Sequence, residues 1–494
     1  MADTHYFYIA VIILPLLSAI AAFLWPRVEV FIGLATAVII TLLIAQWIGP
    51  DLKVAGAFYV LGGWQPPLGI ALYADGLSAV MLVMTAVAGF AISLYASAYF
   101  EKKQSRDSGK ELLFWPVWLI MWAALNALFL SADIFNIYVT LELVSLSAVA
   151  LVALAGKPEA NSAALRYLLV GLFGSLAYLF GVALLYGEYA TLDYTRLGGL
   201  ITATPTSIIA LAMMSTGLIM KAALFPMHFW LPPAHSSAPA PVSALLSALV
   251  VKGAVYLLFR IWFNIFDEII TGFAVQLMGV LGAAAILWGS VQALRAERLK
   301  LLVAYSTVAQ IGYLFLAFPL ILKTGTAAAM SGAVYLMVSH ALAKAAMFTS
   351  AGTIMKVAGH DRLKDLGGTS QRYPITVFTI AIAGVSLIGL PPSGGFMGKW
   401  QLLNAAFVSG QWWWVIILLL GSLLAAAYIF RVIAHAFSHL DNLPPRKTLD
   451  WRLEWPALFI ATIALILGLL AYPLDGLLDI GQVLSQVPKP DTAL

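Results

Sequence analysis

The chain has 494 residues, of which 62% are hydrophobic and only 10% are charged. Soluble globular proteins carry about 25% charged residues, so this composition excludes an ordinary soluble domain and indicates a protein embedded in a membrane. The chain has no cysteine and a net charge of only +4. We therefore expect no disulfide, iron–sulfur or thiolate metal site, no bound cofactor and no nucleic-acid partner, and any redox chemistry must lie on another subunit.

The sequence predicts an all-α polytopic membrane protein. A helix that crosses the hydrocarbon core needs about 20 apolar residues, and by that measure we count about fourteen transmembrane helices. The first apolar run has no basic region before it and no small-residue cleavage signal after it. We therefore interpret it as a retained helix and not as a signal peptide.

The predicted helices follow one another along the whole chain. Helices one to six are expected near residues 6–25, 28–47, 76–100, 113–130, 134–155 and 160–186. Helix seven begins near Thr206, and helices seven and eight continue to Arg260. Helices nine, ten, eleven, thirteen and fourteen are expected near residues 270–294, 299–320, 326–355, 412–434 and 455–472. Helix twelve is expected to start near Ile375 and to be broken at residues 389–395. The Gly- and Pro-containing segment 51–75 is expected to form an extramembrane loop with a hairpin.

The positive charges of the loops predict an orientation. If the N-terminus lies outside, sixteen Lys and Arg residues fall in inside loops, and four fall outside, namely Lys53, Arg196, Lys323 and Lys489. Cytoplasmic loops carry the excess of Lys and Arg. We therefore expect a multi-pass protein of the cell inner (plasma) membrane with both termini on the non-cytoplasmic side.

Helices seven and twelve are predicted to be broken. A proline-rich segment, HFWLPPAHSSAPAP, follows Lys221, and GLPPSGG precedes Lys399. Proline ends a helix and frees backbone carbonyls that lipid cannot satisfy, and broken helices at matching places in two halves point to a transport path. Five helices separate the breaks, so the halves would have opposite orientation. We divide the chain into residues 1–112 (helices 1–3), two inverted five-helix repeats at 113–263 and 264–437, and 438–494 with helix 14 and a tail.

Four charged residues lie in three of the predicted helices. Glu142 lies in the middle of helix five and Lys221 lies in helix seven. Lys252 lies in helix eight, which ends at Arg260. Charges near the bilayer centre are costly and usually functional, so we expect Glu142 to pair with Lys221 and Lys252 to act as a relay element. A carboxylate held only for packing is the alternative for Glu142. The alternative for a lysine is snorkelling to the interface, an interpretation that suits Arg260, at a helix end, and fits Lys252 poorly.

Further polar candidates lie beside these charges. His340 and Lys344 are four residues apart and share a helical face, where an imidazole can bridge two lysines. His228 and His235 flank the first break, and we do not expect them to bind a metal. Tyr305, Ser306, Thr307 and Gln310 place hydroxyl and amide groups on helix ten, where simple helix–helix hydrogen bonds are the alternative function. Lys399, after the second break, is expected to face a hydrated interior.

Four motifs, in this order, resemble one protein family. They are HFWLPPAHSSAPAPVSALLSALVVKGAVYLLFR, LVAYSTVAQIGY, HALAKAAMF and GLPPSGGFMGK. They resemble the antiporter-like subunits shared by respiratory complex I, membrane-bound hydrogenases and Mrp-type multisubunit cation/proton antiporters. The resemblance covers nearly the whole chain. It implies fourteen helices, two inverted repeats and a proton path along the membrane midplane.

The resemblance also implies roles and partners. Glu142 and Lys221 match the ion pair of the first half-channel, Lys252 with His340 or Lys344 the connecting relay, and Lys399 the terminal proton carrier. The partners would be a homologous antiporter-like subunit, small multispanning subunits and lipid. Pro233 stands where relatives have an aspartate, and Gln310 where many complex I members have a histidine.

Two functions fit these residues. DIFNIYVTLE resembles the D-type subunit of Mrp antiporters and the hydrogenase branch, so we expect a proton-translocating subunit of an Mrp-type Na⁺(cation)/H⁺ antiporter. The alternative is a proton-pumping membrane subunit of a redox enzyme, either a membrane-bound hydrogenase or a complex I-like oxidoreductase. Protons suit a lysine relay, whereas a sodium site needs carboxylate and carbonyl oxygens, and only Glu142 is central.

Overall fold

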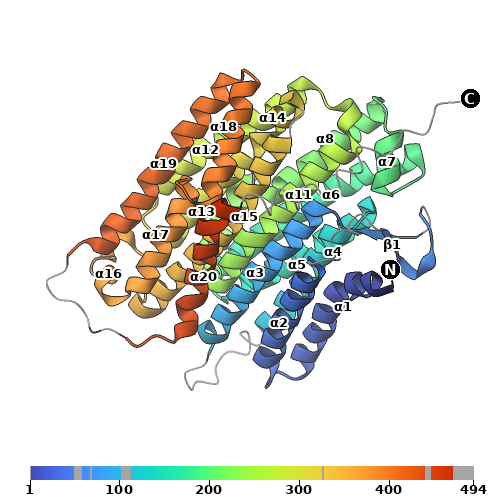
Figure 1. The fold of residues 1–494 in the computed structure, drawn as a ribbon. Helices are drawn as coiled ribbons and strands as arrows, with labels where there is room; N and C mark the ends of the chain where they lie inside the picture. Colours follow the sequence, from blue (N-terminus) through green and yellow to red (C-terminus); the bar gives the residue numbers. More distant parts are fainter. Residues whose placement is uncertain are drawn as a thin grey trace, which may run out of the picture.

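The computed structural model describes residues 2–48, 58–66, 69–101, 113–324, 327–439, 445 and 447–470. These residues form a bundle of long, roughly aligned helices (Figure 1). In the described part, eleven helices are long and apolar enough to cross a membrane. The other three predicted spans are helical as well, as α4 (Phe114–Leu130), α15 (Ala327–Ala358) and the pair α17 (Pro374–Ile388) and α18 (Gly394–Val408). The all-α polytopic prediction is confirmed.

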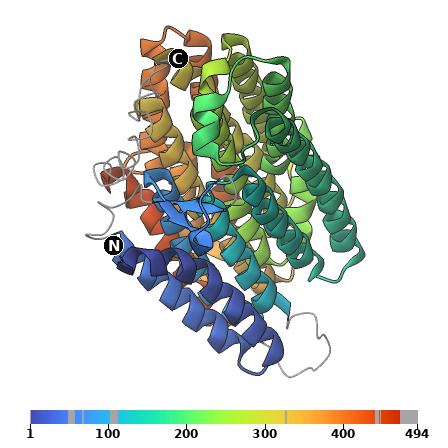
Figure 2. The same ribbon diagram turned by 90° about the vertical axis from the view of Figure 1, so that its right-hand side faces the viewer.

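The N-terminal helices pack together at one side of the bundle. α1 (Ala2–Leu24) and α2 (Glu29–Trp47) form a pair that Figure 2 shows at the edge of the molecule. They precede a two-stranded antiparallel hairpin of β1 (Phe58–Val60) and β2 (Ala71–Tyr73), in which Tyr59 pairs with Leu72. The described part of the predicted loop thus contains the expected hairpin. Asp75 then starts α3 (Gly76–Tyr99) because its side chain accepts a hydrogen bond from the Ser78 amide.

The next helices lead to the first break. They are α4, α5 (Ile134–Ala153), α6 (Pro158–Tyr189), the short α7 (Tyr194–Leu200) and α8 (Pro205–Ala222). After α8 the chain forms four short helical segments, which are η4 (Met227–Trp230), α9 (Leu231–Ser237), α10 (Ala240–Leu245) and η5 (Leu246–Val250). It then continues in α11 (Val251–Arg260), η6 (Ile261–Ile265) and η7 (Asp267–Ile269). Residues 240–262 are all buried, so this part of the chain forms the centre of the bundle.

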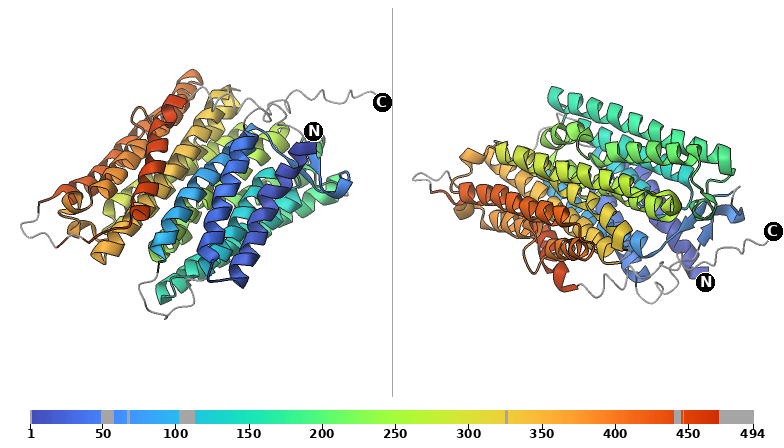
Figure 3. Two further views of the ribbon diagram at one scale, coloured as in Figure 1. Left: turned by 60° about the horizontal axis from the view of Figure 1, so that its bottom comes forward. Right: turned by 90° about the horizontal axis from the view of Figure 1, so that it is seen from above.

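The remaining helices include the second break. They are α12 (Gly272–Arg295), α13 (Leu299–Phe315), α14 (Ala317–Thr324), α15, η8 (Leu363–Asp365) and α16 (Thr369–Arg372), followed by α17, α18 and α19 (Trp412–Phe437). The chain closes with η9 (Trp451–Leu453), α20 (Trp455–Ile466) and η10 (Leu467–Leu470). Seen from above in Figure 3, α6 and the pair α18 and α19 lie at opposite edges of the bundle. The inverted relation of the two repeats and their boundaries stay predictions.

Close helix contacts depend on glycine. A Cβ on Gly217 of α8 would lie 2.2 Å from the carbonyl oxygen of Gly174 in α6, and a Cβ on Gly174 would lie 2.8 Å from the Gly217 oxygen. Small residues let helix backbones approach in a membrane, where van der Waals packing drives association. The crossing of α6 and α8 therefore requires glycine on both helices, and it fixes α8 where the first break begins.

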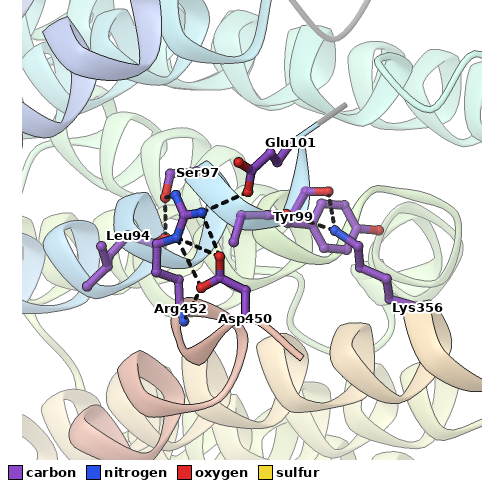
Figure 4. Close-up of polar contacts among 8 residues, drawn as sticks. Leu94, Ser97, Tyr99, Glu101, Lys356, Asp450 and Arg452 are labelled. Carbon is purple, nitrogen blue, oxygen red and sulfur yellow. Dashed lines mark hydrogen bonds and ion pairs between the residues drawn. The ribbon is translucent and has the colours of Figure 1, made fainter. Parts of the chain in front are cut away.

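The two ends of the bundle differ in their polar contacts. We call the end with β1 and β2, the start of α3 and the end of α11 the hairpin face, and the end with the finish of α3 and α15 and the start of α20 the basic face. At the basic face Lys356 donates to the carbonyl oxygens of Ala98 (2.8 Å) and Tyr99 (3.0 Å), which end α3 (Figure 4). Arg452 there bonds Glu101 (2.7 Å) and Asp450 (2.6 Å). These contacts tie the ends of three helices together.

Candidate functional site

The first polar group lies where α8 ends. Lys221 Nζ lies 3.5 Å from Glu142 Oε2 and donates to Ser145 Oγ at 2.5 Å. Ser145 is one helical turn from Glu142 on α5, and Ser175 of α6 donates to the Glu142 carboxylate. The Lys221 side chain is 4% exposed and that of Glu142 is 19% exposed. The predicted ion pair is present, and hydroxyl groups on two helices hold it.

The second group surrounds Lys252 in the centre of the bundle. Lys252 is fully buried on α11, and its Nζ donates to the Ser247 carbonyl oxygen in η5. The Ser247 hydroxyl lies 3.0 Å from Thr307 Oγ1 on α13. In the described part of the chain no carboxylate lies within 4.0 Å of Lys252 Nζ. Snorkelling is therefore wrong for Lys252, whose ammonium group binds a backbone carbonyl oxygen inside the protein.

The third group lies between α13 and α15. Lys344 Nζ donates to the Val303 carbonyl oxygen at 3.0 Å and to the Ser306 hydroxyl. Val303 O also accepts from Thr307 at 3.0 Å. Thr307 thus connects the surroundings of Lys252 and Lys344. His340 lies one turn before Lys344, and neither of its ring nitrogens has a hydrogen-bond partner among the described residues.

The fourth group lies at the second break. Lys399 on α18 donates to the carbonyl oxygens of Leu387 (3.1 Å) and Ile388 (2.9 Å), the last residues of α17. It also bonds Ser422 Oγ on α19 at 3.1 Å and lies over the Tyr313 ring at 4.3 Å. The break therefore frees carbonyls, as predicted, and Lys399 binds them. Gln310 Nε2 on α13 donates to the same Leu387 oxygen at 2.9 Å.

The remaining candidates differ in their surroundings. His228 accepts a 3.1 Å hydrogen bond from Trp288 Nε1 on α12. His235 is 1% exposed, stacks on Phe348, and has no hydrogen-bond partner on either ring nitrogen in the described part. Tyr305 is only partly buried, unlike the other three polar candidates of α13. No group of three or more His, Cys, Asp or Glu residues that could hold a metal ion occurs among the described residues.

The expectation for Arg260 is wrong. Arg260 does not snorkel to an interface, because it is 7% exposed and forms a bidentate ion pair with Asp75 of α3. The two residues are 185 positions apart. A helix-end arginine is typical of snorkelling, and nothing local in the sequence indicated a carboxylate that distant.

Sequence reasoning also missed the hydroxyl groups that hold the lysines. The hydroxyl groups of Ser145, Ser175 and Ser422 each bond one of the charged residues, whereas Ser247 binds Lys252 through its carbonyl oxygen. Serine in a membrane helix commonly bonds its own helix backbone, as Ser145 also does with the Leu141 carbonyl oxygen at 2.9 Å. The residue type alone therefore gave no signal for these contacts.

Family comparison identifies the protein family and supports the fold. The family model described as NADH:quinone oxidoreductase/Mrp antiporter, TM, matches residues 131–425, which include all twelve candidate residues. The chain belongs to this family. A second family model, described as NADH-Ubiquinone oxidoreductase (complex I), chain 5 N-terminus, matches residues 65–108. The predicted resemblance is confirmed.

Individual members of this NADH:quinone oxidoreductase/Mrp antiporter family match most of the chain. The NADH-quinone oxidoreductase N subunit of Desulforudis audaxviator is 36% identical over 94% of this chain and 95% of its own. The Na(+)/H(+) antiporter D subunit of Bacillus subtilis is 30% identical over 83% of this chain and 82% of its own. A chain of the membrane-bound sulfane sulfur reductase, an archaeal respiratory membrane complex, matches with a TM-score of 0.86 and 27% identity, over 96% of both chains. This chain is therefore a multi-pass antiporter-like membrane subunit of a multisubunit complex.

Proposed function

We propose that this subunit moves protons along the membrane midplane, through Glu142 and Lys221, then Lys252, then His340 and Lys344, to Lys399. The observation that supports the proposal is the series of four buried lysines, of which one has a carboxylate within 4.0 Å in the described part of the chain. Burying an unpaired charge costs several kcal/mol, so such residues are retained for a purpose.

The lysines of the proposed relay are joined by shared hydrogen-bond partners. Lys252 and Lys344 are connected through Ser247, Thr307 and Val303, and α13 also binds the carbonyl that holds Lys399. A lysine ammonium can release its proton and take up another, whereas a guanidinium cannot. An imidazole titrates near neutral pH, so His340, whose two ring nitrogens have no hydrogen-bond partner in the described part, would pass a proton between lysines.

We further propose that the parent complex is an Mrp-type Na⁺(cation)/H⁺ antiporter in which this chain acts as the D-type subunit. The Bacillus subtilis antiporter relative supports this proposal. The partners would be a homologous antiporter-like subunit and small multispanning subunits, with H⁺ and Na⁺ as the exchanged ions and the chain itself without a cofactor. A redox-driven complex is the second candidate, because the Desulforudis audaxviator relative belongs to an NADH-quinone oxidoreductase.

One preparation separates the two candidates. The tagged protein is purified with its partners and reconstituted in liposomes with a pH-sensitive dye inside. An Mrp-type antiporter collapses an imposed pH difference when Na⁺ is added, and it copurifies with small multispanning chains. A complex that generates a pH difference only when an electron donor and acceptor are supplied, and copurifies with redox subunits, would assign the chain to the second candidate.

We also propose that the chain lies in the plasma membrane with both termini outside and with inverted repeats at residues 113–263 and 264–437. The charge bias of the loops supports the orientation. Because the chain has no cysteine, single cysteines can be introduced without a background. A cysteine in place of Ala203, which lies exposed just before α8, should react in intact cells with a reagent that does not cross membranes. One in place of Ser370 in α16 should react only in broken cells.

A further inference from the structure

α11 carries a line of three polar residues that runs from the relay to the hairpin face. Lys252, Tyr256 and Arg260 are spaced four residues apart, so they lie on one face of the helix. Eight residues of helix span about 12 Å. The three residues are 0%, 2% and 7% exposed. Tyr256 and Arg260 are the polar side chains that a proton leaving Lys252 along this face of the helix would meet.

A buried ion pair occupies the far end of this line. The Arg260 guanidinium forms a bidentate pair with the Asp75 carboxylate, and the side chains of both residues are 8% exposed. Arg260 Nη2 also donates to Ser78 Oγ at 2.9 Å, and Arg260 Nε donates to Tyr256 Oη at 3.0 Å. Asp75 is fixed in turn, because it accepts from the Ser78 amide at 2.9 Å. The pair thus joins the start of α3 to the end of α11.

The hydroxyl groups around the pair have acceptors that cannot relay a proton. Tyr256 Oη donates to the carbonyl oxygen of Phe129 on α4 at 2.8 Å, and Ser78 Oγ donates to the same oxygen at 2.7 Å. A backbone carbonyl accepts hydrogen bonds and has no proton to pass on. Arginine stays protonated at every accessible pH, so it does not pass one on either. The hydrogen bonds of Tyr256 therefore end at Arg260 and at the Phe129 carbonyl oxygen, neither of which passes a proton on.

We propose that Asp75 and Arg260 form an electrostatic seal that closes this end of the relay, so that protons at Lys252 do not leak to the hairpin face. A fixed guanidinium in a narrow passage repels protons and other cations, as in selective channels. Asp75 neutralises the buried charge, and the hydroxyl groups of Tyr256 and Ser78 also hold the guanidinium in place. The inference rests on the proposed relay through Lys252. The alternative is a clasp that only joins α3 to α11.

Two substitutions distinguish a seal from a clasp. Arg260→Lys keeps the positive charge but introduces a group that can release its proton, so a seal becomes leaky while a clasp is largely kept. Asp75→Asn removes the counter-charge but leaves the guanidinium in the passage, so a seal stays closed to protons. A clasp predicts the reverse order, because Asp75→Asn removes the ion pair and Arg260→Lys does not.

The measurement is passive proton leak in liposomes that contain the whole purified complex. An outside–inside pH difference is imposed without Na⁺ or electron donor, and its decay is followed with a pH-sensitive dye. We expect Arg260→Lys to raise the leak rate about tenfold, equivalent to about 1.4 kcal/mol of barrier. We expect Asp75→Asn to leave the rate unchanged. The matched control is Arg298→Lys, which changes another arginine in an ion pair, with Asp361, at the start of α13.

A double variant shows where the leaked protons come from. Lys252→Met in the Arg260→Lys background should restore the low leak rate, because the line then has no proton source. A leak that persists in the double variant, or a larger leak in Asp75→Asn than in Arg260→Lys, would overturn the seal. If Lys252→Met alone leaves transport normal, the proposed relay fails. If it stops transport and Arg260→Lys does not leak, only the seal fails.

Discussion

Glu142→Gln tests the ion pair of the first break. The charged atoms of Glu142 and Lys221 lie 3.5 Å apart, which corresponds to ~5 kcal/mol of attraction at an effective dielectric constant of about 20. Glu142 is 19% exposed, so water screens part of this attraction. Loss of about 3–5 kcal/mol is typical when one partner of a buried pair is removed. Glutamine keeps an oxygen for the Ser175 hydroxyl, so the substitution removes mainly the charge.

The expected result is an assembled complex with little transport. If about 3 kcal/mol of this attraction is needed for proton transfer at Lys221, the transport rate falls by a factor of roughly 100 or more. The assay is dye-monitored proton transport in vesicles with equal amounts of complex, after subunit composition has been checked on a gel. Glu159→Gln is the matched control, since Glu159 lies exposed in the first turn of α6. Normal transport by an intact Glu142→Gln complex would refute the role of this carboxylate.

Four further outcomes are expected. Lys252→Met and Lys252→Arg should both block transport in vesicles without preventing assembly, and normal transport by the arginine variant would mean that residue 252 is a fixed charge. Lys399→Ala should stop net transport while Lys399→Glu retains part of it, and a normal rate for the alanine variant would exclude the terminal carrier. Gly217→Ala should cost about 1–3 kcal/mol by overpacking and lower the melting temperature, unlike Gly187→Ala, whose Cβ would meet no atom within 4 Å. A hydrogen bond from Arg452 lowers the pKa of Asp450 below 3.8, so its stabilisation should be constant from pH 5 to 8 and lost on acidification below about pH 4, as melting curves of Asp450→Asn would show.

The lysines of the site could be found from the sequence because of what charge costs in a membrane. Charges are rare in this chain, so each one in an apolar stretch stands out, and Lys221, Lys252, Lys344 and Lys399 are all buried in the structure. The two breaks were equally visible, because proline cannot continue a helix and glycine allows the turn that follows. The sequence therefore determined the fold class, the breaks and the residue types of the proposed relay.

The tertiary structure decided how these residues are connected. Lys221 meets Ser145 across 76 positions, and Arg260 meets Asp75 across 185. Serine and threonine are common in membrane helices and bond their own backbone, so no local pattern shows which of them faces a lysine. The free energy of such a contact depends on two surfaces that meet only when the helices pack. A charged residue in an apolar segment can therefore be found from the sequence, whereas the group that binds it is known only from the packed structure.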